Sequence, residues 1–155
     1  MSTPREVLES AAQKFCSAFA EKKDIETIMS FFSTKHPISA VEYGDPVLAQ
    51  FVGRPFEGNE GVKKYFGLLA STITYEGMHF SEYVVDTETR KVALKGKGHF
   101  IWSDTCESWN ETFAYVLDFD EDLQLVRYQV WADSGAAYLA RKGRLEEERK
   151  YHSEE

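Results

Sequence analysis

The sequence has little positive charge, few cysteines and no long apolar run. Its 26 acidic residues outnumber its 18 Lys and Arg residues, and the net charge of -8 disfavours a polyanion, so we expect no nucleic-acid partner. Cys16 and Cys106 show neither metal-site spacing nor a disulfide framework, which is typical of a reducing compartment. No stretch is long enough to span a bilayer, and the first residues lack the apolar core of a signal peptide. We therefore expect a soluble, cytoplasmic protein with no membrane partner.

Motifs for metals, phosphates and reactive thiols are missing as well. No pair of histidines stands at helical spacing together with an acid, so we predict no metal site. Gly53 and Gly58 do not directly follow a strand and precede no Gly-Lys-Ser/Thr, which excludes a phosphate-binding loop. Neither cysteine has a neighbour that would lower its pKa, so a thiol nucleophile is not expected.

Aromatic residues, by contrast, are abundant. They make up 14% of the 155 residues, and hydrophobic residues make up 43%, enough for one domain with a core and an apolar cavity. Residues 144–155 are almost all charged, so we predict one domain over 1–143 followed by a charged tail. We see no internal repeat and no low-complexity linker.

The predicted elements begin with helices and continue with strands. A capping box at Thr3 and Glu6 begins a helix to about Glu21, Asp24 caps a shorter one, and Asn59 caps a third. A short strand is predicted over 38–44, a long one over 73–86, and three more within 90–133, joined by loops at 103–106 and 120–122. A helical turn or two should follow over 136–141. This order predicts an α+β fold, in which a curved antiparallel sheet wraps around the N-terminal helices as a cystatin-like, cone-shaped roll.

The strands on either side of loop 103–106 have one apolar face and one polar face. The apolar face carries Val92, Leu94, Gly96, Gly98, Phe100 and Trp102 on one strand, and Trp109, Glu111, Phe113, Tyr115, Leu117 and Phe119 on the other. If Trp102 pairs with Glu107, Glu111 lies opposite Gly98, beside a gap in the side chains. Burial should raise the pKa of Glu111 and make it a candidate acid or base. Alternatively, it reaches water or pairs with a cation.

Several aromatic residues are candidates for the lining of a cavity that favours a flat or ring-containing ligand. They are Phe100, Trp102, Trp109 and Phe113, together with Met78 and Phe80 of the strand over 73–86. The facing of that strand is ambiguous, and we place Met78, Phe80 and Val84 inside as the more apolar set. Tyr43, Tyr115 and Tyr128 are candidate hydrogen-bond donors to a substrate. Core packing is the alternative for each of these residues.

Two other groups lie outside this cavity or at its edge. His36 precedes the first strand, either at the pocket mouth or, as we prefer, on the ordinary surface. Arg127, Gln129 and Trp131 share the outer face of the last strand, where an exposed aromatic residue among polar ones indicates an interface. We expect a homodimer through this outer sheet face.

Two segments resemble the nuclear transport factor two-like superfamily, and within it the SnoaL-like polyketide cyclase branch. Residues 53–66 contain the family's glycine, spacer, glycine, then valine, two residues and an aromatic, at a helix start. Residues 125–133 end in an aromatic, one residue and Asp, as the family's last strand commonly does. The resemblance covers roughly Arg5 to Lys142. It implies an α+β roll with a deep apolar pocket, often a dimer, and either a non-catalytic binder or an enzyme that needs no cofactor, because a buried carboxylate or His can move protons by itself.

The family's catalytic residues transfer only in part. Members like epoxide hydrolases use Arg-x-Asp on a middle strand and Asp on the last strand, where this chain has Gly96, Gly98, Phe100 and Val130, so that chemistry is not expected. SnoaL-like cyclases use a late-strand Asp as general base. Asp133 is the nearest match, but alternation turns it outward unless the strand end is bulged.

The sequence therefore supports three hypotheses. The first is an isomerase, cyclase or dehydratase that moves protons on a small apolar or aromatic molecule through Glu111, Tyr115 and Asp133. The second is a non-catalytic binder of such a ligand, and the third is a dimeric interaction module with a filled core. An enzyme or binder predicts a cavity of ~300 Å³ or more.

Overall fold

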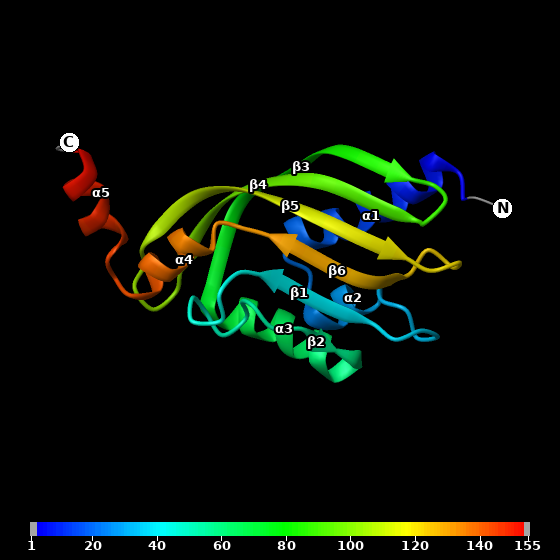
Figure 1. Ribbon diagram of the computed structural model, residues 1–155, viewed down its shortest axis with the longest axis horizontal. Helices are drawn as coiled ribbons and strands as arrows, with labels where there is room; N and C mark the ends of the chain where they lie inside the picture. Colours follow the sequence, from blue (N-terminus) through cyan, green and yellow to red (C-terminus); the bar gives the residue numbers. More distant parts are fainter. Residues whose placement is uncertain (1–2, 154–155) are drawn as a thin grey trace.

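The computed structural model describes residues 3–153, which fold into one mixed six-stranded sheet with the order β2-β1-β6-β5-β4-β3 (Figure 1). The four long strands are β3 (Ile73–Asp86), β4 (Lys91–Trp102), β5 (Ser108–Phe119) and β6 (Leu125–Trp131), which pair antiparallel in sequence order as predicted. β1 (Ser39–Tyr43) instead pairs parallel with β6, and β2 (Phe56–Glu57) pairs antiparallel with β1 at the edge. β1 and β6 are far apart in the sequence, and no short turn joins them. The antiparallel direction that a hairpin imposes therefore does not apply to this pair.

Within residues 3–153, five helices accompany the sheet, and three of them cover its inner face. These are α1 (Arg5–Ala20), α2 (Ile25–Met29) and α3 (Gly58–Thr72), while α4 (Ser134–Arg141) and α5 (Leu145–Ser153) lie at one end of the strands (Figure 1). Apolar side chains of α1 and α3, including Leu8, Phe15 and Tyr65, are fully buried against the sheet. The observed fold is the α+β roll expected from the order of elements.

The helix starts agree with the sequence at one of three places. Asp24 caps α2, with its carboxylate accepting the Thr27 N–H at 2.8 Å. Thr3 and Asn59 are not caps, which corrects both predictions. The residue before α1 is Pro4, and the Thr3 N–H donates to the Thr87 carbonyl at the β3–β4 turn. Asn59 lies inside the first turn of α3 and not before it.

The β4–β5 hairpin has the predicted register. The Trp102 N–H donates to the Glu107 carbonyl at 2.8 Å, and Gly98 lies opposite Glu111. The expected gap beside the acid is, however, filled: the Phe113 ring lies over Gly96, and the Met78 side chain covers Gly98. The prediction of missing side chains was therefore wrong, because neighbouring strands supply the atoms that the glycines lack.

β3 changes facing along its length, which corrects the placement of Val84. Register shifts occur after Glu76 and after Ser81, where Gly77 and Glu82 adopt φ values of +61° and +59°. Met78 and Phe80 pack against the core as predicted, but beyond the second shift Tyr83 and Val85 do so, and Val84 is 68% exposed. A β-bulge adds a residue to one strand and so reverses the alternation after it.

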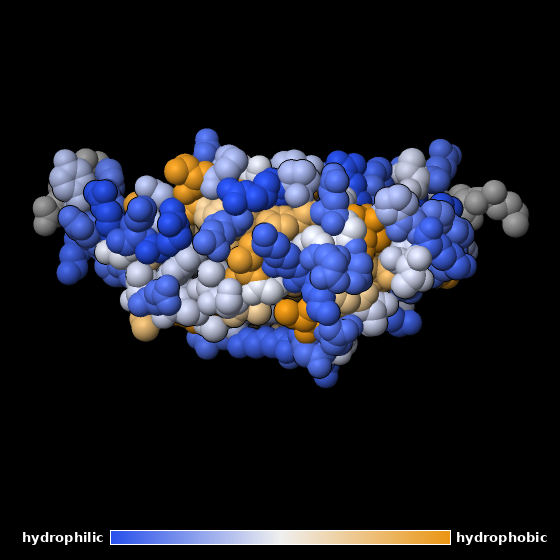
Figure 2. Space-filling view, turned by 90° about the horizontal axis from the view of Figure 1, so that it is seen from below, coloured by the Kyte–Doolittle hydropathy of each residue, from blue (hydrophilic) through white to orange (hydrophobic). Residues whose placement is uncertain are grey.

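The charged C-terminal segment forms α5 and contacts the β4–β5 loop. The Glu107 carboxylate accepts the N–H groups of Leu145 at 2.8 Å and Glu146 at 3.1 Å, and Leu145 is buried. Seen from below, the molecule is largely covered by polar side chains, with apolar side chains in patches between them (Figure 2). Within residues 3–153, no helix has the length and apolar character needed to cross a membrane.

Candidate active site

One cavity lies between the inner face of the sheet, α3 and the start of α4. The cavity has an enclosed volume of about 40 Å³, within a space of about 470 Å³ that includes its opening to solvent. Its lining is Phe19, Glu42, Phe51, Tyr65, Leu69, Ile73, Phe100, Trp109, Glu111, Phe113, Tyr115, Tyr128, Val130, Ala132, Asp133 and Ala137. The enclosed room is much smaller than the ~300 Å³ expected of a ligand pocket, because aromatic side chains occupy most of the interior.

Glu111 on β5 faces into this cavity, as the alternation of the strand predicts. Its side chain is buried, and the Trp109 indole Nε1–H donates to its Oε1 at 2.8 Å. Burial raises the pKa of Glu111 to about 7 despite the Trp109 hydrogen bond, which lowers it, and the charge of nearby Asp133 raises it further. Glu111 thus titrates near neutral pH.

Glu42 on β1 is a second buried carboxyl in the same cavity, and the sequence analysis missed it. Ala40 and Glu42 occupy the buried face of the strand, and the Tyr65 hydroxyl donates to Glu42 Oε1 at 2.9 Å. Burial raises the pKa of Glu42 to about 8, with the Tyr65 hydrogen bond opposing and the Glu111 charge adding to the shift. In the sequence, Glu42 alternates with Val41 and Tyr43 on the predicted strand. This pattern does not show which face of the strand is buried.

Three tyrosines continue from Glu42 across the cavity wall. The ring centroids of Tyr65 and Tyr128 are 5.5 Å apart, and those of Tyr115 and Tyr128 are 5.0 Å apart. All three rings are fully buried, and burial raises the pKa of each hydroxyl, so they remain neutral hydrogen-bond donors. Tyr115 and Tyr128 were candidate hydrogen-bond donors in the sequence, whereas Tyr65 was not among the candidates.

Asp133 also lines the cavity, although strand alternation predicted that it would face outward. β6 ends at Trp131, so Asp133 lies beyond the strand and caps α4, with its Oδ1 accepting the Ala136 N–H at 3.1 Å. The end of the strand, rather than a bulge, turns this residue toward Glu111. Asp133 is thus a third acid in the lining of the cavity, near Glu111.

The other predicted lining residues divide into two groups. Phe100, Trp109 and Phe113 line the cavity, and the first two rings stack at 5.8 Å. Trp102 stacks on Phe51, Phe80 stacks on Tyr115, and Met78 lies over Gly98, so these three residues pack behind the lining.

Tyr43 does not face the cavity. It lies on the outer sheet face, stacks on Trp131 at 4.7 Å and donates its hydroxyl to Gln129 Oε1 at 2.6 Å. The interpretation of Tyr43 as a substrate-binding residue is therefore wrong, because the buried face of β1 carries Glu42 instead.

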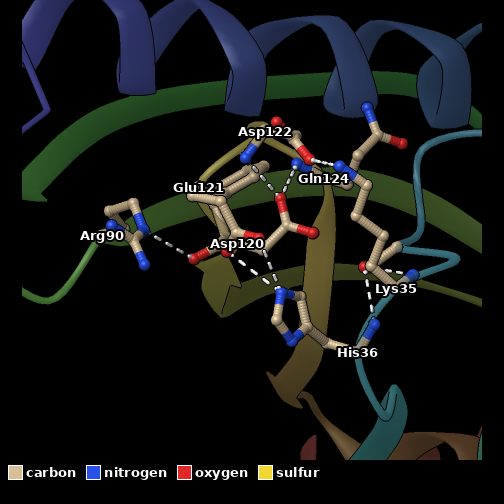
Figure 3. Close-up of polar contacts among 9 residues, drawn as sticks. Lys35, His36, Arg90, Asp120, Glu121, Asp122 and Gln124 are labelled. Atoms are coloured by element: carbon tan, nitrogen blue, oxygen red, sulfur yellow. Dashed lines mark hydrogen bonds and ion pairs between the residues drawn. The ribbon is translucent and has the colours of Figure 1, made fainter.

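His36 belongs to the opposite end of the sheet, near the β5–β6 turn (Figures 1 and 3). It is exposed and contacts the Glu121 carboxylate at 2.8 Å, so it is a surface residue and not part of the pocket mouth. Figure 3 shows Asp120 beside this pair, and ligand atoms of the three residues lie within 4.8 Å of one another. Asp120 Oδ1 accepts the N–H groups of Asp122 and Gln124, and these hydrogen bonds order the turn.

Known structures share the arrangement of helices and sheet described above. BvnE pinacolase from Penicillium brevicompactum is 19% identical, with a TM-score of 0.66 over 99% of this chain and 100% of that chain. AusH from Aspergillus nidulans is 24% identical, with a TM-score of 0.63 over 84% and 86%. A nuclear transport factor two-like protein of unknown function from Burkholderia pseudomallei is 12% identical, with a TM-score of 0.72 over 86% and 95%.

The chain has the nuclear transport factor two-like fold. The resemblance seen in the sequence is thus confirmed at the level of the fold. No family model matches the sequence, and no curated protein matches it.

Within this nuclear transport factor two-like fold, the cavity brings together groups suited to moving protons. Glu42 and Glu111 titrate at about 8 and about 7, so both protonation states of each are populated near neutral pH. A carboxyl with a pKa near the working pH can both donate and accept a proton. The surrounding aromatic rings bury both carboxyls, and proton transfer is effective in such an environment.

Proposed function

We propose that this protein is a cofactor-independent enzyme of the isomerase or cyclase type that moves protons on a small apolar molecule. The observation that carries the proposal is the pair of buried carboxyls, Glu42 and Glu111, in one aromatic cavity, with pKa values of about 8 and about 7. The pinacolase activity in the name of BvnE, a protein of the same fold, is consistent with rearrangement chemistry.

The difference between the two pKa values gives the two glutamates different roles. At neutral pH Glu42 is mostly protonated and acts as the acid, whereas Glu111 is partly ionised and acts as the base. Glu111 then removes a proton from one atom of the substrate while Glu42 supplies one to another, and the net reaction leaves the composition of the substrate unchanged. Tyr128 and Tyr115 support a polar group of the substrate by hydrogen bonding, and Asp133 raises the basicity of Glu111.

The test is turnover of a panel of small ring-containing ketones, epoxides and diols, followed by NMR. Glu111→Gln and Glu42→Gln should each lower kcat by at least about 100-fold, the usual contribution of a general acid or base. The rate should peak between pH 7 and 8, because the base must be ionised and the acid protonated. Glu88→Gln, in the exposed β3–β4 turn, removes the same charge far from the cavity and should leave the rate unchanged. Equal rates for Glu111→Gln and wild type would contradict the proposal.

The small enclosed volume favours one alternative, an interaction module whose interior is filled by its own side chains. Only about 40 Å³ is available inside, whereas ligand pockets usually offer roughly 300 Å³ or more. Such a module would bind none of the panel compounds, and Glu42→Gln and Glu111→Gln would leave its interactions intact. Ligand-observed NMR with the same panel separates the two functions without an assay of turnover.

A further inference from the structure

The cavity contains acidic groups and no basic group. Glu42, Glu111 and Asp133 lie in its wall, and none of its lining residues within 3–153 is Lys, Arg or His. None of the ion pairs formed by the described residues includes these three acids. Any negative charge that develops in the cavity is therefore left without a protein cation to balance it.

A side chain holds each of the two buried glutamates through one oxygen. Tyr65 donates to Oε1 of Glu42, and Trp109 donates to Oε1 of Glu111. Neither donor carries a charge, so these bonds orient the carboxyls without neutralising them. The Asp133 backbone N–H also donates to the Glu111 carboxylate. Within the described part of the chain, no side chain donates to Oε2 of Glu42, which leaves this oxygen for a ligand.

Aromatic rings complete the surroundings of the two acids. Phe100, Trp109, Phe113 and Tyr128 line the same space, and Trp109 stacks on Phe100 at 5.8 Å. The face of an aromatic ring attracts a cation and repels an anion, and this attraction grows where water is excluded. Carboxyls and rings thus favour the same sign of charge in the ligand.

We infer that the cavity selects a small ring-bearing molecule whose polar group carries positive charge, with an organic ammonium ion as the simplest case, and that it rejects carboxylates. This inference deepens the proposed function and rests on it: if Glu42 protonates the substrate before Glu111 removes a proton, positive charge develops on the substrate between the two transfers. The proton balance is simple. A protonated glutamate releases its proton to solvent as the ammonium ion binds, and the carboxylate that remains balances the ligand.

The test compares three molecules of the same shape that differ in charge: benzylammonium, benzyl alcohol and benzoate. Isothermal titration calorimetry at about pH 6 and about pH 8, in two buffers of different ionisation heat, measures affinity and proton release together. We expect benzylammonium to bind at least about tenfold more tightly than benzyl alcohol at about pH 8, with weaker binding at about pH 6, and benzoate not to bind. Proton release should accompany ammonium binding alone.

Variants show whether Glu42 and Glu111 cause the preference for ammonium. The double variant Glu42→Gln/Glu111→Gln should lose the preference for ammonium and retain the affinity for benzyl alcohol, whereas Glu88→Gln should behave as wild type. Circular dichroism and thermal unfolding verify that each variant is folded, and the two single variants serve if the double variant is not. Benzoate binding as tightly as benzylammonium, a preference that persists in the double variant, or no binding of any of the three would each overturn the inference.

The outcome for charge selectivity is separable from that for catalysis. Turnover of a neutral panel compound without a preference for ammonium overturns only this inference. A clear preference for ammonium in a protein that turns over nothing overturns only the proposed function.

Discussion

Glu42 and Glu111 occupy positions at which an apolar residue would stabilise the fold. Burial of an ionised carboxyl is costly, and the cost is reflected in the pKa values of about 8 and about 7. The side-chain hydrogen bonds that they accept, from Tyr65 and from Trp109, come from uncharged donors. Buried acids that lower the stability of the fold and line a cavity are candidates for a functional role.

The first prediction at the residue scale concerns stability and pH. Both pKa values lie above the value of 4.5 for an unperturbed Glu, so the folded protein binds more protons than the unfolded chain over the interval from pH 4.5 to about 8. The free energy of unfolding should therefore be highest near pH 4.5, as far as these two groups are concerned, and fall as pH rises, by up to ~1.4 kcal/mol per pH unit for each carboxyl. Urea denaturation at a series of pH values measures this slope.

Glu42→Gln isolates the contribution of one carboxyl. Gln is neutral and can still accept the Tyr65 hydroxyl, so the variant should match the wild type near pH 4.5 and exceed its free energy of unfolding by roughly 5 kcal/mol above pH 8. Glu88→Gln is the control with an exposed side chain, and its slope should equal that of the wild type. If the free energy of unfolding of Glu42→Gln falls with pH as steeply as that of the wild type, Glu42 does not contribute to the slope. Its pKa in the folded protein would then lie near its value in the unfolded chain.

The two acids differ in how well the sequence could predict them. Glu111 lies on a long strand whose alternate residues are nearly all apolar, so its inward direction follows from its neighbours. Glu42 lies on a five-residue strand with Val41 and Tyr43 on the other face, and there the apolar face is the outer one. Hydrophobic alternation predicts which residues share a face, but only tertiary pairing decides which face is buried.

At the element scale, β4 depends on two glycines for close packing rather than for backbone freedom. The Phe113 ring occupies the place where a Gly96 side chain would lie, whereas at Gly98 a Cβ would meet Met78 Cε at 3.0 Å and Phe100 Cε2 at 3.3 Å. A ring held between strands cannot move aside as the end of a Met side chain can. The two positions should therefore differ in their tolerance of a methyl group.

The second prediction compares Gly96→Ala with Gly98→Ala. Gly96→Ala should lower the free energy of unfolding by about 1–3 kcal/mol through overpacking, while Gly98→Ala should change it by less than about 1 kcal/mol because Met78 adjusts. Urea denaturation measures both variants against the wild type. The inverse order would mean that Met78, and not Phe113, is the more rigid neighbour. Each variant is the control for the other, since both add one methyl group to the same face of β4.

β3 shows why the boundaries of an element were easier to predict than its facing. Its limits, Ile73 and Asp86, agree with the sequence prediction because turn residues follow at 87–89. The facing of Val84 was wrong because Glu82, a non-glycine residue, adopts a φ of +59° and introduces a bulge. Nothing in the residue type of Glu82 indicates this, whereas the first bulge has a glycine, Gly77.

At the scale of the whole molecule, the roll could be predicted and the interior of its cavity could not. The order of helices and strands limits the topologies to a few, and the chain adopts one of them. The enclosed volume depends on the rotamers of many aromatic side chains at once, including Phe51, which comes from the loop before β2. A sequence pattern carries no information on such packing, and so the expected cavity of ~300 Å³ exceeds the observed one.

The outer face of the sheet is the molecule's candidate for self-association, and we propose that it forms a homodimer. Trp131 is 43% exposed and stacks on Tyr43, and Arg127 on the same strand is also exposed. Gln129, between them on this face, is buried and accepts the Tyr43 hydroxyl, so it orders the patch rather than offering a free contact. A rigid aromatic pair with a polar rim is the composition of an interface core.

Trp131→Glu tests this proposal, because it places a charge in the centre of the patch, and two such charges would face each other across a two-fold axis. Sedimentation equilibrium of the wild type should give twice the mass of one chain, and Trp131→Glu should weaken the association at least about 100-fold. Val84→Glu is the matched control, since Val84 is 68% exposed on the edge strand β3, away from the patch, and should leave the dimer intact. A wild type that sediments as a monomer at all concentrations, or a Trp131→Glu variant that dimerises as well as the wild type, would remove the outer face from the interface and leave Tyr43 and Trp131 as surface packing.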